Sequence, residues 1–282
     1  MSEMLTLEAF EEASIKVKEV TQETKLVESP YLTAATGNRV WLKPENMQRT
    51  GAYKVRGAYY KISTLTPEEL SRGIITASAG NHAQGVAFAA TRAGAKSIVV
   101  MPTTTPLIKV ERTKDYGAEV VLHGDVYDEA CEYAMHLAET EGYTFIHPFN
   151  DPVVATGQGT IAMEIVQELP LVDTILVPIG GGGLSCGVST FAKLYNPKIR
   201  VIGVEPAGAP WKRAMWSSSP QRAPSRTEPR YLNPATWSIR MSATTWTRSS
   251  RSRTRNSSYR SWTWSRTTRW WWRTPACSPW RR

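Results

Sequence analysis

The sequence predicts an α/β protein whose core is a mostly parallel β-sheet. Short apolar runs of strand length alternate with longer amphipathic segments throughout residues 1–210. The intervening segments are long enough for the helices that join parallel strands through right-handed crossovers. The chain of 282 residues can bury a core large enough for one large domain or two modest ones.

Seven apolar runs predict strands because they are short and flanked by Gly, Pro or polar residues. The predicted strands are residues 39–42, 73–77, 97–101, 119–122, 144–147, 174–178 and 200–204. Segments with apolar residues near helical spacing predict helices between them. The predicted helices are residues 7–20, 81–93, 109–116, 127–141, 157–168 and 184–195.

Residues 211–282 have a different composition from the rest of the chain. They hold 16 of the 34 Lys and Arg, one acidic residue (Glu228) and ten of the eleven Trp. They contain no Val, no Phe, one Leu and one Ile, and a sheet core needs aliphatic side chains. We therefore expect this Arg/Trp/Ser-rich tail to be poorly ordered, with few contacts to the body. The excess of positive charge belongs to the tail, since residues 1–210 hold 18 basic and 24 acidic residues.

Other features limit the class of protein. The first 20 residues lack the basic and then apolar layout of a signal peptide, and no apolar stretch is long enough to span a membrane. The three cysteines have no metal-ligand spacing. We expect no metal site, no membrane partner and a cytoplasmic location.

The first candidate motif is residues 50–58, TGAYKVRGA. Lys54 lies among small and apolar residues at a predicted transition from loop to helix. Desolvation there lowers the pKa of an amine and makes it nucleophilic, which suits Schiff-base chemistry. Alone, the motif is also compatible with an ordinary surface lysine at a helix start.

The second motif, residues 78–85 (SAGNHAQG), follows a predicted strand and opens a helix. Small residues at a helix N-terminus expose backbone N–H groups that can bind a carboxylate, and Asn81 adds a neutral donor and acceptor. A capped helix start with a tight turn is the structural alternative.

The third motif is a run of four glycines, Gly180, Gly181, Gly182 and Gly183, followed by Leu184. It lies between a predicted strand and a predicted helix, where backbone N–H groups and the helix dipole together favour a phosphate. The pattern is neither a Walker A motif nor a G-x-G-x-x-G fingerprint, which argues against nucleotide binding. A flexible connector is the structural alternative.

Together the three motifs resemble the fold type II (tryptophan synthase β-like) pyridoxal-phosphate enzymes, and most closely the threonine dehydratases, or threonine ammonia-lyases. The resemblance runs in order from about Leu5 to Ala209. It includes residues 40–51, 101–102, 116–122, 147–149, 151–152 and 157–160.

The resemblance implies a role for each motif. Lys54 is expected to be the catalytic residue that carries pyridoxal 5′-phosphate, with Tyr53 packed against the ring and Asn81 on its 3′-oxygen. The glycine run with Leu184 is expected to bind the phosphate. The expected substrate-carboxylate residues are Ser78, Ala79, Gly80 and His82.

The implied reaction is α,β-elimination of L-threonine, and also of L-serine, to a 2-oxo acid and ammonia; threonine gives 2-oxobutanoate. The alternative within the fold is a serine racemase, which carries a serine where this chain has Ala79. Ala79 therefore favours the dehydratase. Ala52, where the family usually has Ser, is a further departure.

The resemblance also predicts two domains with the cofactor between them. The large domain is expected from residues 1–47 and 151–210, incomplete relative to the family, and the small domain from residues 48–150. The intact family is expected to form homo-oligomers and to act in isoleucine biosynthesis or threonine catabolism.

A shift of reading frame is the favoured explanation of the tail. Moving the frame back one base converts the Trp codons of Trp270, Trp271 and Trp272 into Met, Leu or Val followed by two Val. The same shift allows family-like, aliphatic sequence at residues 225–237 and 256–278. The alternatives for the tail are a disordered linker, a divergent domain and a basic, aromatic nucleic-acid-binding extension. The alternative function of the chain is that of an inactive truncated or frameshifted remnant. We predict no nucleic-acid partner.

Overall fold

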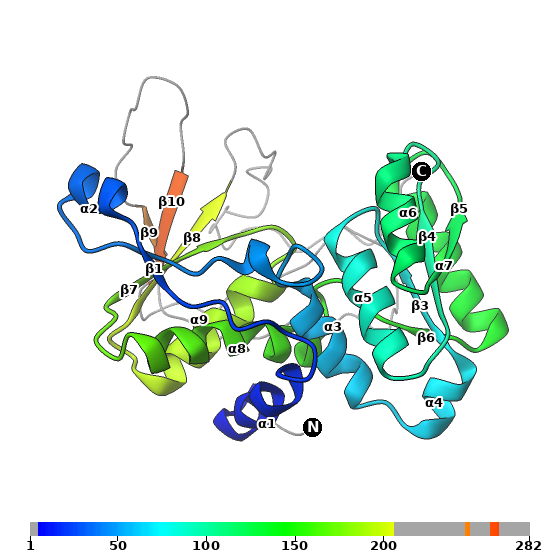
Figure 1. Ribbon diagram of the computed structural model, residues 1–282, viewed down its shortest axis with the longest axis horizontal. Helices are drawn as coiled ribbons and strands as arrows, with labels where there is room; N and C mark the ends of the chain where they lie inside the picture. The colour runs from blue at the N-terminus through cyan, green and yellow to red at the C-terminus, as the bar shows by residue number, and fades with distance from the viewer. Residues whose placement is uncertain (1–4, 206–245, 249–259, 265–282) are drawn as a thin grey trace, which may run out of the picture.

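The computed structural model describes residues 5–205, 246–248 and 260–264. These residues form two main β-sheets, each packed against helices, and a long helical layer runs between the two (Figure 1). The first main sheet comes entirely from the segment predicted as the small domain, and the second begins in the segment predicted as the large one. The domain limits themselves stay a prediction.

The first sheet has four parallel strands in the order β5-β4-β3-β6. Parallel order and buried strands agree with the apolar runs that predicted them, because a parallel sheet is normally covered on both faces. The strands are β3 (Ile74–Ala77), β4 (Ser97–Met101), β5 (Glu119–Leu122) and β6 (Thr144–Phe145).

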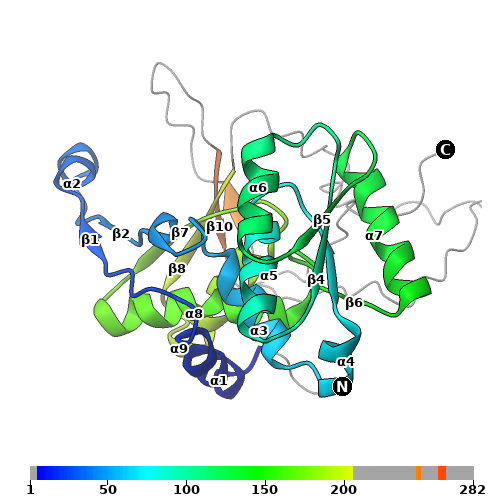
Figure 2. The same ribbon diagram turned by 45° about the vertical axis from the view of Figure 1, so that its right-hand side comes forward.

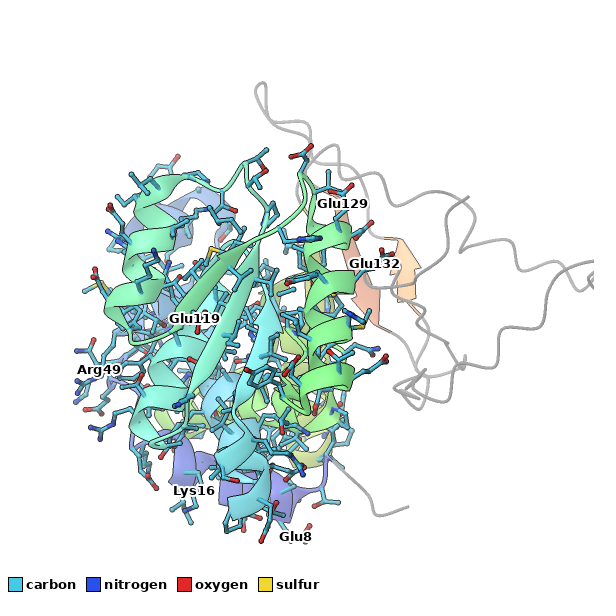
Figure 3. All side chains as sticks on the ribbon, turned by 90° about the vertical axis from the view of Figure 1, so that its right-hand side faces the viewer. Glu8, Lys16, Arg49, Glu119, Glu129 and Glu132 are labelled. Carbon is cyan, nitrogen blue, oxygen red and sulfur yellow. The ribbon has the colours of Figure 1, made fainter. Side chains whose placement is uncertain are left out.

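Helices cover both faces of this sheet. Ile75 and Val100 face α7 (Tyr127–Glu141) and pack with its Ala130 and Ala134. From the opposite face, Val99 packs with residues of α5 (Asn81–Arg92) and α6 (Leu107–Asp115). In Figure 3 this sheet and its helices face the viewer, with Glu119 on β5 and the exposed Glu129 and Glu132 on α7. The helices thus bury most of the residues of the two central strands, β3 and β4, while the edge strands β5 and β6 are less buried.

The second sheet contains β7 (Thr174–Pro178) and β8 (Arg200–Glu205), which are parallel. Ile175 and Val177 pack into a core shared with α1 (Leu7–Val17), α8 (Pro152–Glu168) and α9 (Gly183–Tyr195). The side chain of Leu176, on the other face of β7, is 66% exposed. Among the described residues, the packed core of this sheet therefore lies on its helical face.

Two short strands from the tail extend the second sheet, which has the order β7-β8-β10-β9. β10 (Arg260–Trp264) pairs antiparallel with β8, and β9 (Trp246–Arg248) pairs antiparallel with β10. This pairing is a contact between the described part of the tail and the body; the rest of residues 211–282, on which the expectation of a poorly ordered tail falls, lies outside the described residues. The edge of β8 offers unpaired backbone N–H and C=O groups, and a Thr- and Trp-containing segment can pair with them without aliphatic side chains.

Helix α3 (Lys54–Ser63) joins the two halves because it packs against both α5 and α8 (Figure 2). The contact with α8 is close: a Cβ atom built on Gly157 would lie 2.7 Å from the Cα of Gly57. Small residues at the crossing let the two backbones approach. The helix that begins at Lys54 is thereby fixed against both halves.

The remaining elements surround these layers. α2 (Pro30–Thr36) is preceded by its N-cap Ser29 and followed by its C-cap Gly37, whose φ of +69° suits glycine. The other elements are the strands β1 (Val27–Glu28) and β2 (Trp41–Leu42), the 3₁₀-helix η1 (Glu45–Met47) and α4 (Pro67–Arg72). Within the described ranges, no helix combines the length and apolar character needed to cross a membrane.

Candidate active site

Lys54 is the first residue of α3, and its amine is buried between the two halves of the molecule. Nζ donates a hydrogen bond to the carbonyl oxygen of Pro148 at 2.6 Å. It lies 5.7 Å from the ring centroid of Tyr53 and 5.9 Å from that of Phe149. Burial lowers the pKa of Lys54 to about 8. The amine is therefore easier to deprotonate than that of an exposed lysine.

The glycine run forms the turn between β7 and α9, as predicted. Gly182 precedes the helix with φ +93°, a conformation that favours glycine. A Cβ atom on Gly180 or Gly182 would meet no atom within 4 Å, whereas one on Gly181 would lie 2.3 Å from the Phe149 ring. One side of the turn is thus open and the other rests on Phe149.

Phe149 connects the predicted lysine to the predicted phosphate loop. Its ring lies near Lys54 Nζ on one side and contacts the backbone of Gly181 on the other. Pro148 and Phe149 lie within the family resemblance, but the resemblance assigns them no role. Topology offers the signal that was missed: β3 and β6 are parallel neighbours, so the segments after both strands meet at one edge of the sheet.

The motif of residues 78–85 turns from β3 into α5, also as predicted. Ser78, Ala79 and Gly80 are partly buried, and Asn81 opens the helix with an exposed side chain. A Cβ atom on Gly85 would lie 3.1 Å from the backbone nitrogen of Val55. The first turns of α5 and α3 are therefore side by side, which brings this motif next to Lys54.

His82 and Leu184 are placed differently from the other predicted residues. His82 Nε2 lies 3.2 Å from the carbonyl oxygen of Ile146, while its Nδ1 is buried with no hydrogen-bond partner. Nε2 therefore carries the hydrogen, and the ring has no N–H free to donate to a carboxylate. Leu184 is 9% exposed and packs in the core below β7. Leu184 can thus reach a ligand only through its backbone.

Two buried histidines stay neutral beside Lys54. Burial, and then the Lys54 charge, lower the pKa of His82 to about 3. Burial also lowers the pKa of His147 to about 4. Lys54 is consequently next to uncharged imidazoles at neutral pH.

Acidification is expected to destabilise the fold through these histidines. Between pH 6.5 and about 4 the unfolded chain binds protons on both rings and the folded chain does not. The free energy of unfolding therefore decreases as the pH is lowered through this range. Each ring contributes roughly 1.4 kcal/mol per pH unit. Urea unfolding at pH 7.5, 6 and 5 measures the slope, and His147→Gln should flatten it. The same change at the exposed His136 on α7 should not; equal slopes in both variants would contradict this assignment.

The arrangement defines a class of protein: a two-part α/β protein in which a buried amine and a turn suited to an anion both lie next to Phe149. The chain belongs to the family of pyridoxal-phosphate-dependent enzymes, whose sequence pattern matches residues 17–244. The structure has the fold type II architecture of that family. It is similar to threonine deaminase isoform 2 from Solanum lycopersicum, with a TM-score of 0.68 and 43% identity over 72% of this chain and 61% of that one.

The chain is also similar to a bacterial relative and to a second solved structure. The L-threonine ammonia-lyase of Thermotoga maritima is 49% identical over 207 residues, which are 73% of this chain and 52% of the relative. A maize serine racemase structure has a TM-score of 0.71 and 36% identity, covering 74% of this chain and 63% of that one. The chain spans about half the length of the curated relatives it matches first.

Pyridoxal phosphate fits the residues present. The open side of the glycine turn leaves room at Gly180 and Gly182 for a phosphate at the N-terminus of α9, a helix of 13 residues. The buried Lys54 amine has the lowered pKa that a carbonyl-binding lysine needs. Among the described residues, no group of three His, Cys, Asp or Glu is placed to hold a metal ion.

Proposed function

We propose that this chain carries the site for pyridoxal-phosphate-dependent α,β-elimination of L-threonine, and of L-serine, to a 2-oxo acid and ammonia. One observation carries the proposal. The buried Lys54 amine, with its lowered pKa, is joined through Phe149 to an open glycine turn at a helix N-terminus. The names of the relatives, L-threonine ammonia-lyase and threonine deaminase, support the choice of substrate.

Each motif then has a chemical task. Lys54 holds the cofactor and, once released from it, removes the Cα proton of the substrate as a general base. The carbonyl oxygen of Pro148 accepts a hydrogen bond from Lys54 Nζ and so orients the amine. When bound, pyridoxal phosphate supplies the electron sink that makes this proton acidic.

The two helix starts bind the two anionic groups. The backbone N–H groups at the start of α9, together with residues 180–183, hold the cofactor phosphate. The start of α5, with Ser78, Ala79 and Gly80, binds the substrate carboxylate, and Asn81 binds the 3′-oxygen of the cofactor. We assign His82 to positioning, because its Nε2–H is occupied by Ile146.

Lys54→Ala is expected to abolish the reaction. The variant loses both the covalent link to the cofactor and the general base, so threonine turnover should fall at least about a thousand-fold. Formation of 2-oxobutanoate measures turnover, and borohydride reduction followed by peptide mass analysis locates the cofactor. Lys61→Met, at the other end of α3, is the control and should keep the cofactor on Lys54. Cofactor fixed to another lysine in the unaltered chain would contradict the assignment.

Serine racemisation is the second candidate, and the likeness to a serine racemase structure favours it. Ala79 argues against it, because alanine has no hydroxyl to act as an acid or base on the second face of the substrate. Incubation with L-serine separates the two: pyruvate without D-serine supports elimination, and D-serine supports racemisation.

An inactive, frameshifted chain is the third candidate, because the composition changes sharply after residue 210. The DNA sequence around codons 209–225 tests it directly, and restoring the frame should then restore threonine turnover. We also propose a cytoplasmic location, a homo-oligomer and a part in isoleucine biosynthesis or threonine catabolism.

A further inference from the structure

Arg56, two residues after Lys54, has a fully buried guanidinium whose five N–H donors all have acceptors. Two contacts go to Glu45, from Nε and Nη2 at 2.8 Å each. Two go to Glu164, from Nη1 at 2.5 Å and Nη2 at 3.0 Å, and the fifth goes from Nη1 to Thr160 Oγ1 at 3.3 Å. The side chain is 0% exposed. A guanidinium with every donor used is held in one orientation.

The three charged residues form what we call the Arg56 cluster: Arg56, Glu45 and Glu164. It joins the 3₁₀-helix η1, the first turn of α3 and the middle of α8. Lys43 extends the cluster, because its amine lies 2.8 Å from Glu164. Glu45 is 11 positions before Arg56 and Glu164 is 108 positions after it, so the cluster ties three segments together beside the start of α3.

The start of α3 needs such an anchor because it has no local one. Tyr53 precedes the helix in a helical conformation and provides no side-chain cap. Uncapped helix ends fray. Successive residues of an α-helix are about 100° apart, so the side chains of Lys54 and Arg56 leave the helix in nearly opposite directions. Arg56 grips η1 and α8 while Lys54 reaches Pro148.

We propose that Arg56, held by Glu45 and Glu164, is the positioning residue of Lys54: it fixes the first turn of α3 so that the Lys54 amine stays buried against Pro148 and Phe149. The inference deepens the proposed function and rests on it for the chemical role of Lys54.

Loosening the Arg56 cluster should raise the pKa of the Lys54 amine as well as lower the stability of the fold. The pKa of Lys54 is lowered by burial, so access of water to the first turn of α3 raises it toward the ordinary value for lysine. A contact that only stabilised the protein would alter the unfolding temperature and leave this pKa unchanged.

Competitive acetylation of the full chain with acetic anhydride across a pH series, read lysine by lysine by mass spectrometry, tests the proposal without the cofactor. Arg56→Lys keeps the positive charge but cannot form the paired contacts. Glu45→Gln keeps the size of the side chain and removes one charge, and it decides the matter if Arg56→Lys fails to fold. The control is Lys61→Met, which breaks the 3.0 Å ion pair with Asp151 between the same two helices at the far end of α3.

In the unaltered chain, the labelling midpoint of Lys54 is expected near pH 8. In Arg56→Lys and Glu45→Gln it should rise by at least one pH unit, so that the deprotonated fraction of Lys54 at pH 7 is about ten-fold smaller than in the unaltered chain. Lys61→Met should leave the midpoint in place.

An unchanged Lys54 midpoint in the folded variants, with only a lower unfolding temperature, would overturn the proposal. A rise in Lys61→Met equal to that in Arg56→Lys would also overturn it, because any α3–α8 contact would then suffice. Since labelling needs no cofactor, a failure here is separate from a failure of the proposed function, which would appear as missing cofactor on Lys54 in the unaltered chain.

Discussion

Gly187→Ala is expected to destabilise the protein by roughly 3 kcal/mol or more, although alanine is the better helix former. Gly187 lies on α9 where this helix crosses α8. A Cβ atom there would lie 2.0 Å from the carbonyl oxygen of Ala155 and 2.7 Å from the backbone nitrogen of Gly159. Both are backbone atoms, so the two helices must separate. Helix propensity alone predicts a gain of about 1 kcal/mol, and packing reverses the sign.

Urea unfolding followed by circular dichroism measures this loss. Gly180→Ala is the matched control, since a Cβ atom at Gly180 would meet nothing within 4 Å and should leave the free energy of unfolding within about 0.5 kcal/mol. A Gly187→Ala variant as stable as the unaltered chain would show that α8 and α9 do not cross as described.

Local patterns predicted the regular elements well where local physics decides them. The predicted limits of β4 and α7 equal the observed ones, because an apolar run and an amphipathic helix each carry their own period. The helix predicted at residues 157–168 begins earlier, at Pro152. Its start is set by Asp151, which caps the backbone of Val153 and Val154, a signal that the apolar period does not contain.

Some of the features that escaped prediction depend on contacts distant in sequence, although α4, which was also not predicted, begins at a local capping box of Thr66 and Glu69. The pairing of β10 with β8 joins segments about 60 residues apart through backbone groups, which leave no side-chain pattern. The Arg56 cluster likewise brings Glu164 to a residue 108 positions earlier. Charges at such separations give no period to detect, so only the folded chain shows that they meet.

The candidate site divides in the same way. The lysine, the glycine turn and the start of α5 were predicted because each is a short motif at the junction of two elements. Phe149 was given no role because its contacts come from the assembly of the sheet, and a phenylalanine after a strand is common in a protein core. The contact of His82 with Ile146 also depends on the neighbouring strand and occupies the N–H that a carboxylate would need.

Arg56→Met is expected to cost about 3 to 5 kcal/mol of stability at pH 7.5, because removing one side of a buried ion cluster leaves the other side uncompensated. Glu45 and Glu164 would lose all their contacts with the guanidinium, and Glu164 alone would keep a cationic partner, Lys43. Methionine fills much of the arginine volume, so the loss reflects charge more than a cavity.

The pH dependence of the stability loss in Arg56→Met shows whether the loss comes from the charge of Arg56 or from its volume. In the unaltered chain, burial acts to raise the pKa of Glu164, but the hydrogen bonds and charges of Arg56 and then of Lys43 outweigh burial and lower this pKa. Without Arg56, only Lys43 opposes burial, so the pKa of Glu164 rises and the carboxyl takes up a proton at a higher pH than in the unaltered chain. The difference in unfolding free energy between Arg56→Met and the unaltered chain should therefore shrink between pH 7.5 and pH 5. Adding Glu164→Gln should recover part of the loss at pH 7.5, measured by urea unfolding of the single and double variants. A loss that is equal at both pH values and unaffected by Glu164→Gln would show that Arg56 stabilises the fold through its volume alone.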